Sequence, residues 1–313
     1  MKLRPSVLVL LLATLVRVAS ATTPSERQHA GLEQQVGKTL SNGLHVEVGV
    51  DRRVPVATLV IDYDVGIVDD PEAQLGMARL VASLLDGEVT RHFPEGSRRS
   101  VLDMAGVGDW TTQAAALREH TVLSTTVPRS HLPLVLFFEA EKMGFRADGL
   151  APWDVEPRGG LALSSEGESG GAFRGEALPL AFVFGPKHPY ATSLEQQAPP
   201  SPSLAEVRAR LRQLYCPGNA TVLVTGDLDP QLTLRQVEEW FGALPACPNA
   251  PPAAAAEPWE QSVRATLHRK GQHPDELMIW VTPAYLTRDD MTLDVIARAL
   301  SIRLQKRVKE FGE

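Results

Sequence analysis

The fold of this 313-residue sequence is most constrained by the order of its hydrophobic patterns. Two patterns typical of strands are followed by one typical of a helix. The dipeptide Asn42-Gly43 is a turn signal, and polarity alternates from His45 to Val48. A β-branched run over Val56 to Val65 predicts a second strand, and apolar residues at helical spacing over 75–86 predict a helix. Strands in this order favour a sheet that buries one face under helices.

The same order recurs further along the chain. We expect strands over 110–116, 119–127 and 220–225, and helices over 131–144, 203–215 and 231–241. Ser203 followed by Glu206 forms a capping box, which marks the start of the helix over 203–215. Together these patterns predict an α+β fold with a mainly antiparallel sheet and helices packed on it.

The N-terminus has the pattern of a signal peptide over residues 1–21. Lys2 and Arg4 precede an apolar run over Val7 to Val16, and Ala19-Ser20-Ala21 supplies small residues for cleavage. The alternatives are an uncleaved anchor and a buried first helix. Cleavage would change the net charge from −7 to −10, because the segment holds three basic residues and no acidic one. We therefore expect export, to the periplasm or the cell exterior, with no transmembrane segment after signal removal.

The patterns also divide the chain into parts. After the signal peptide we expect one α+β domain over 22–244, then a Pro- and Ala-rich linker over 245–260. Residues 261–313 read as the start of a second domain, with strands over 262–268 and 276–282 and a helix over 288–308. A unit this short is too small for a typical independent domain. It would pack on the first domain, pack on another chain, or belong to a truncated reading frame.

Several classes of function are disfavoured by composition and motifs. A net charge of −7 argues against nucleic-acid binding, which needs a basic surface. The sequence contains no P-loop, no dinucleotide fingerprint and no G-x-S-x-G motif, and no two of its eight histidines stand three or four residues apart. Two cysteines exclude a disulfide scaffold, and their spacing alone leaves open whether they pair or are unrelated thiols.

The chain contains an ordered set of short motifs, which include Leu40-Ser41-Asn42-Gly43-Leu44, Leu75-Gly76-Met77-Ala78, Phe138-Glu139-Ala140-Glu141-Lys142-Met143, Tyr215-Cys216-Pro217-Gly218-Asn219-Ala220 and Gly226-Asp227-Leu228-Asp229. Each motif is weak alone, but together they cover about residues 36–310. The ordered set resembles the M16 family, the zinc metallopeptidases related to pitrilysin and to the mitochondrial processing peptidase. The resemblance implies an M16-like layered domain followed by an incomplete second one.

The family's catalytic motif is lost in this sequence. M16 peptidases bind zinc through an inverted H-x-x-E-H motif, whose histidines share one helix face and whose glutamate acts as general base. The corresponding positions here are Arg79, Ala82 and Ser83. Arginine stays protonated and cannot bind zinc, and alanine cannot take a proton. The third ligand of the family falls near Ser164, with Glu166 and Glu168 as neighbouring carboxylates. We therefore expect no catalytic residues and no metal ligands.

The resemblance also implies two further features. In the family an edge strand pairs with extended substrate by β-augmentation, and the corresponding stretch here is Gln113, Ala114, Ala115 and Ala116. Cys216 precedes a strand and Cys247 follows the helix that returns beside it, so the two are expected to form a disulfide worth about 3–4 kcal/mol.

The function that follows is that of an exported, non-catalytic M16-like protein without a cofactor. It would bind extended peptides or serve as a structural subunit, and its partner would be an M16 homologue with an intact H-x-x-E-H motif. One alternative is an active zinc metalloendopeptidase with an atypical metal site. Another is a truncated remnant without function.

Overall fold

The computed structural model describes residues 34–71, 74–106, 110, 112–155, 202–248 and 288–311. These residues belong to two compact units, which we describe separately: the first includes all described residues up to 248, and the second includes the helix over 288–311. The expected signal peptide, the two strands over 262–268 and 276–282, and the stretch around Ser164 lie outside the described residues. The domain boundaries remain a prediction.

The described part of the first unit is built on a six-stranded sheet with the order β1-β2-β6-β3-β5-β4. Its strands are β1 (Gln34–Thr39), β2 (His45–Val50), β3 (Val56–Tyr63), β4 (Thr112–Ala116), β5 (Thr121–Pro128) and β6 (Ala220–Gly226). Four of the five strand pairs are antiparallel, and the pair β2–β6 is parallel. The expected α+β class with a mainly antiparallel sheet is confirmed.

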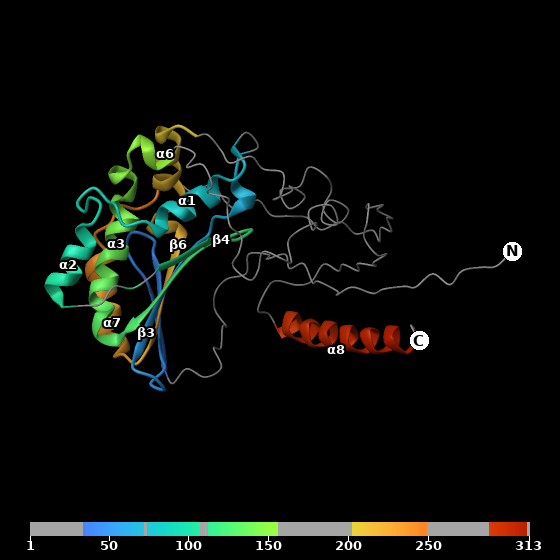
Figure 1. Ribbon diagram of the computed structural model, residues 1–313. Helices are drawn as coiled ribbons and strands as arrows, with labels where there is room; N and C mark the ends of the chain where they lie inside the picture. Colours follow the sequence, from blue (N-terminus) through green and yellow to red (C-terminus); the bar gives the residue numbers. More distant parts are fainter. Residues whose placement is uncertain are drawn as a thin grey trace. The chain divides into compact units, whose positions relative to one another are not determined.

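The helices of this unit gather on one side of the sheet (Figure 1). They are α1 (Met77–Asp86), α2 (Ser97–Ala105), α3 (Leu132–Gly149), the short α4 (Pro152–Val155), α6 (Leu204–Leu214) and α7 (Pro230–Phe241). The capping box of α6 is confirmed, since the Ser203 side chain accepts from the Glu206 backbone N–H and the Glu206 carboxylate accepts from the Ser203 N–H. The Asp229 side chain accepts from the Leu232 backbone N–H and so caps α7, and Pro230 occupies the first helical turn.

Alternation along the strands produces the core. On β3 the side chains of Ala57, Leu59, Ile61 and Tyr63 are buried, while those between them are half-buried. The same period of two appears on β5 and β6, so one face of the sheet is covered by the helices and the other is more open. The buried face meets apolar side chains of α1, α3, α6 and α7 in one hydrophobic core.

The turn between β1 and β2 is the one predicted at Asn42-Gly43. Gly43 has φ of +91°, a conformation that favours glycine. The buried Asn42 amide donates to the carbonyls of Phe241 (2.8 Å) and Leu244 (3.1 Å), and so ties the hairpin to the end of α7. The strand before this turn, β1, was not predicted, because its residues are polar and nearly all exposed.

The second unit contains α8 (Arg288–Phe311), which includes the predicted helix over 288–308 and extends beyond it. Val295, Ile296, Leu300 and Ile302 are its exposed large apolar side chains among those described. None of the helices within the described ranges combines the length and apolar character needed to cross a membrane.

Candidate functional site

Helix α1 carries the three positions that the resemblance aligns with the family's zinc motif. Arg79 is half-buried, Ala82 is only 4% exposed, and Ser83 is exposed. The Ser83 hydroxyl donates to the carbonyl of Leu80, one turn earlier in the same helix (2.7 Å). The serine is therefore engaged with its own backbone, and the alanine lies in the packed layer beneath.

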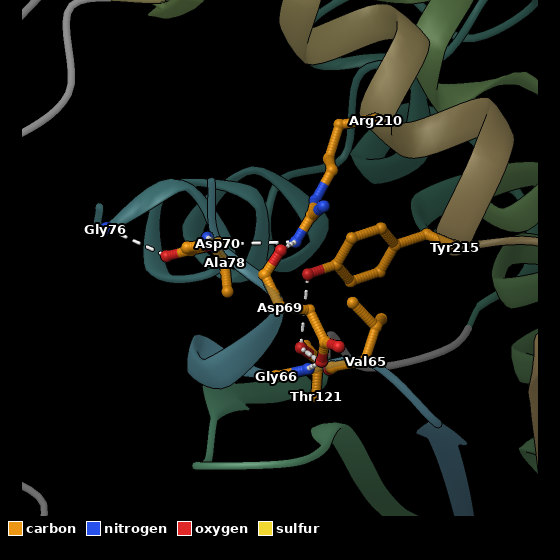
Figure 2. A network of polar contacts seen from close by, with 9 residues as sticks. All are labelled: Val65, Gly66, Asp69, Asp70, Gly76, Ala78, Thr121, Arg210 and Tyr215. Atoms are coloured by element: carbon orange, nitrogen blue, oxygen red, sulfur yellow. Dashed lines mark hydrogen bonds and ion pairs between the residues drawn. The ribbon is translucent and has the colours of Figure 1, made fainter. Parts of the chain in front are cut away.

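The N-terminus of α1 is held by a buried carboxylate, Asp70 (Figure 2). Asp70 accepts hydrogen bonds from the backbone N–H groups of Gly76 (2.8 Å) and Ala78 (2.9 Å), which a helix start leaves without partners. Arg210 of α6 approaches Asp70 at 3.4 Å and donates to the carbonyl of Asp69 (2.8 Å). An ion pair between segments 140 residues apart thus fixes where α1 begins.

Further polar contacts join the segment between β3 and α1, over residues 65–70, to Thr121 of β5 and to Tyr215 at the end of α6 (Figure 2). Asp69 accepts from the Gly66 N–H (2.8 Å), and the buried Thr121 hydroxyl donates to the Val65 carbonyl (2.8 Å). The Tyr215 hydroxyl lies 3.3 Å from that of Thr121. We call Asp69, Asp70, Thr121, Arg210 and Tyr215 the α1 anchor.

Because Asp70 belongs to the α1 anchor, we expect the free energy of unfolding to depend on pH. Burial raises the pKa of Asp70 from 3.8 to about 6, although hydrogen bonds to Ala78 and the Arg210 charge oppose the shift. Between about pH 4 and pH 6 the folded state therefore binds more protons at Asp70 than the unfolded state does. The contribution of Asp70 to the free energy of unfolding is complete below the unfolded pKa of 3.8, and it is lost as the pH rises through about 6. Between pH 5 and pH 7 the loss is about 1 kcal/mol.

Comparison with Asp70→Asn isolates this contribution, because asparagine keeps an acceptor at the helix start and does not titrate. Urea unfolding at pH 5 and pH 7 should show the wild type losing about 1 kcal/mol relative to the variant. Parallel behaviour of the two proteins over this range would show that the folded state does not raise the pKa of Asp70.

The zinc ion that the fold family implies does not fit the residues present on α1. Burial lowers the pKa of Arg79, and the Asp70 charge opposes that shift, but an arginine remains a cation at neutral pH and offers no lone pair. Ala82 has no functional group. In the part of the chain that the structure describes, no three His, Cys, Asp or Glu side chains are grouped as a metal site. The residues around Ser164, Glu166 and Glu168 lie outside that part.

The expected peptide-binding strand is β4, which forms one edge of the described sheet next to α1. Gln113 and Ala115 are exposed on the open face, whereas Ala114 and Ala116 are half-buried. Residue by residue, Gln113 pairs with Ser124 and Ala115 with Val122 of β5. The side chains at the last three positions of β4 are all alanine.

A buried polar network lies beneath β4. Thr125 donates to the Thr112 hydroxyl (2.9 Å), which donates to Glu139 of α3 (3.1 Å). Glu139 pairs with Lys142 one turn later (2.8 Å), and the lysine also donates to the Leu85 carbonyl at the end of α1 (3.2 Å). The two charged side chains are 3% and 7% exposed. This network links the edge strand to both α3 and α1.

Cys216 and Cys247 are joined by a disulfide in the structure, with Cα atoms 5.5 Å apart. That separation is ordinary for a disulfide. The bond connects the turn before β6 to the segment after α7. The closed loop therefore encloses a strand and the helix that follows it.

Several residues of the site carry no signal that a sequence reading could have used. The Asp69-Asp70-Pro71 triplet marks a break, but the partner of Asp70, Arg210, is only one of several arginines on α6. Glu139 and Lys142 have the spacing of a surface helix pair, and their burial follows only from the packing of α3 against the sheet.

Comparisons with known proteins agree with this architecture. The family model described as the peptidase M16 inactive domain matches residues 202–310. The first half of the periplasmic protease PqqL from Escherichia coli is similar, with 18% identity and a TM-score of 0.54 over 72% of this chain and 50% of that chain. A peptidase M16 inactive domain from Pseudomonas fluorescens is similar over 72% of this chain and 55% of that one (21% identity, TM-score 0.52).

The ferredoxin protease FusC, solved as a mutant in complex with Arabidopsis ferredoxin, matches over 71% of this chain and 25% of its own (20% identity, TM-score 0.55). The chain thus spans a quarter to about half of these solved chains. No curated protein sequence matches it. The described fold is that of a layered α+β domain. More particularly it is the M16 fold, so the resemblance drawn from the motifs is confirmed.

Proposed function

We propose that this chain is an exported, non-catalytic M16-like protein that binds extended peptide and partners an active M16 peptidase. The observation that carries the proposal is the combination of Arg79, Ala82 and Ser83 at the zinc positions with an M16 fold around them. The start of α1 is anchored by Asp70 and Arg210, so the helix is retained as a structural element.

Peptide binding is supported by β4 and the network beneath it. A peptide that adds to an edge strand is held by backbone hydrogen bonds, which do not depend on the lost zinc residues. Thr112, Glu139 and Lys142 fix the strand from behind, so its edge is preformed. Preformed edges reduce the entropy that binding must offset.

Export is supported by three separate features. The first 21 residues have signal-peptide character, and the disulfide between Cys216 and Cys247 suits an oxidising compartment. PqqL, which shares the fold, is a periplasmic protease.

Metal analysis tests the non-catalytic part of the proposal. Protein purified in the presence of zinc should contain far less than one zinc ion per chain, and any trace of peptide hydrolysis should be unaffected by a chelator. Addition of an M16 homologue with an intact H-x-x-E-H motif should produce a complex that hydrolyses peptides. Stoichiometric zinc that is lost together with hydrolysis on chelation would instead establish an atypical active metallopeptidase.

Fluorescent labelling tests the peptide edge. Because both native cysteines are bonded, Gln113→Cys introduces a free thiol on β4, and Gln35→Cys introduces a matched one on the exposed strand β1 at the opposite edge. An extended peptide of about ten residues should change the emission of a dye at position 113 in a saturable manner and leave position 35 unaffected. A peptide with N-methylated alternate amides should have no effect. Equal responses at both positions would contradict binding along β4.

A further inference from the structure

The segment after α7, over residues 245–248, forms one wall of a cavity of about 230 Å³ in the first unit. The other walls are largely apolar and include Met143 of α3 and Leu211 of α6. Cys247 of the segment is half-buried, and the disulfide joins it to the buried Cys216. The disulfide therefore connects this wall of the cavity to the rest of the domain.

The disulfide is the main attachment of residues 245–248 apart from the chain itself. Leu244, the residue before them, is buried, and its carbonyl accepts a hydrogen bond from the Asn42 amide (3.1 Å). Pro245 and Pro248 have no backbone N–H, and among the described residues the segment 245–248 forms no hydrogen bond. Once the disulfide is broken, Leu244 is still held in place, and no other bond in the described domain keeps the segment against the cavity.

The other walls of the cavity do not depend on the disulfide. An ion pair between Asp148 and Arg212 joins α3 to α6, and the hydrophobic core of the domain includes neither cysteine. The Sγ atom of Cys216 lies 3.3 Å from the carbonyl oxygen of Gln213, a distance at which a free thiol donates a hydrogen bond. Reduction therefore releases one wall, leaves the others in place and gives the buried thiol a partner.

We infer that the disulfide between Cys216 and Cys247 is a redox-sensitive switch, whose reduction by a dithiol frees residues 245–248 and opens the cavity while the domain stays folded. The opening is local, because the freed segment has no hydrogen bonds of its own to lose. The segment also begins the predicted linker over 245–260, so reduction frees the first residues of that linker as well.

The more exposed sulfur, that of Cys247, is the point of attack. Gly218 beside it has no side chain, and a Cβ atom there would lie 3.4 Å from the Cys247 Sγ. One thiolate of the reductant forms a mixed disulfide with Cys247, and Cys216 leaves as a thiolate that takes a proton from water. The second thiol of the reductant then displaces Cys247. The protein disulfide gains two electrons, and the dithiol is oxidised to its own disulfide.

NMR of the full chain, labelled with ¹³C at the methionine methyl groups, tests the opening. Met143 lines the cavity and is 9% exposed, whereas Met77 of α1 is 1% exposed, does not line it and is the internal control. Met143→Leu and Met77→Leu assign the two resonances. Dithiothreitol should shift the Met143 resonance and increase its broadening by a soluble paramagnetic reagent at least about twofold, with Met77 unchanged.

The variant Cys216→Ala, Cys247→Ala should give the shifted Met143 resonance without any reductant. A Met143 resonance that is the same in the oxidised protein, the reduced protein and this variant would overturn the inference. Equal changes at Met77 would also overturn it, because they would show loosening of the whole domain. A third contrary result is a disulfide that excess dithiothreitol leaves intact in the folded protein, as measured by alkylation and mass spectrometry.

The point of attack is tested with a monothiol, which forms the mixed disulfide and has no second thiol to complete the reduction. Brief exposure of the folded protein to reduced glutathione, followed by acid quenching and mass spectrometry of its peptides, should locate glutathione on Cys247. Glutathione on Cys216 alone would overturn the assignment of Cys247 as the sulfur that the reductant reaches first.

Discussion

Replacement of Lys142 with methionine is expected to lower the free energy of unfolding by about 3–5 kcal/mol. The change leaves Glu139 charged at 3% exposure, with the Thr112 hydroxyl as its remaining described partner. Its second oxygen, Oε2, already has no hydrogen-bond partner among the described residues. Removal of one member of a buried pair costs far more than the pair contributes, because the other charge remains in a medium of low polarity. Urea unfolding followed by circular dichroism measures the effect.

The double variant Glu139→Gln, Lys142→Met should recover most of that loss, since glutamine can still accept from Thr112 and carries no charge. The matched control is Lys38→Met, which breaks the exposed pair between Lys38 and Glu238 (2.7 Å). Exposed pairs of this kind contribute less than about 1 kcal/mol. If Lys142→Met costs no more than Lys38→Met, the pair beneath β4 is not desolvated as the structure describes.

Removal of the disulfide is the second change with a large expected effect. The variant Cys216→Ala, Cys247→Ala should lose about 3–4 kcal/mol of stability, because the bond spans 31 residues and restricts the unfolded chain. Guanidinium unfolding of wild type and variant measures the difference. Alanine is suitable because Cys216 is buried and a serine there would need a hydrogen-bond partner.

A reducing agent provides the control for this experiment. Dithiothreitol should lower the unfolding midpoint of the wild type toward that of the double alanine variant and should leave the variant itself unchanged. A wild type that is equally stable with and without the reductant would show that the bond contributes nothing to folding stability.

Patterns of neighbouring residues in the sequence predicted most helices and strands of this fold. They did not predict strand β1 or the strand order, which depend on contacts between residues far apart in the chain. Ser203 and Glu206 predicted the start of α6, because a capping box depends on neighbouring residues alone. The Asn42-Gly43 turn was equally local. Strand β1 was not predicted because its polar, exposed residues show no alternation, and the order of the sheet depends on where β6 inserts.

The candidate site follows the same division. The loss of the zinc motif at Arg79, Ala82 and Ser83 could be recognised from the sequence because the motif lies within five residues of one helix. The burial of Arg146 could not be recognised in this way, since it depends on packing against Gly87 and Val89 just after α1. Burial of a charged side chain is a property of tertiary packing and leaves no pattern in the local sequence.

The place of β6 in the sheet has a consequence for the order of synthesis and folding. β6 lies between β2 and β3, and its residue Val224 pairs with Val48 of β2 and with Leu59 of β3, all in the centre of the core. Neither pair can form before Val224 has been synthesised. Contacts so distant along the chain slow folding, because a long loop must close before they form. A ribosome must therefore have made about 226 residues before this sheet can close. The two parts of the sheet, β1–β2 and β3–β5–β4, would therefore stay separate until most of the described chain has been synthesised.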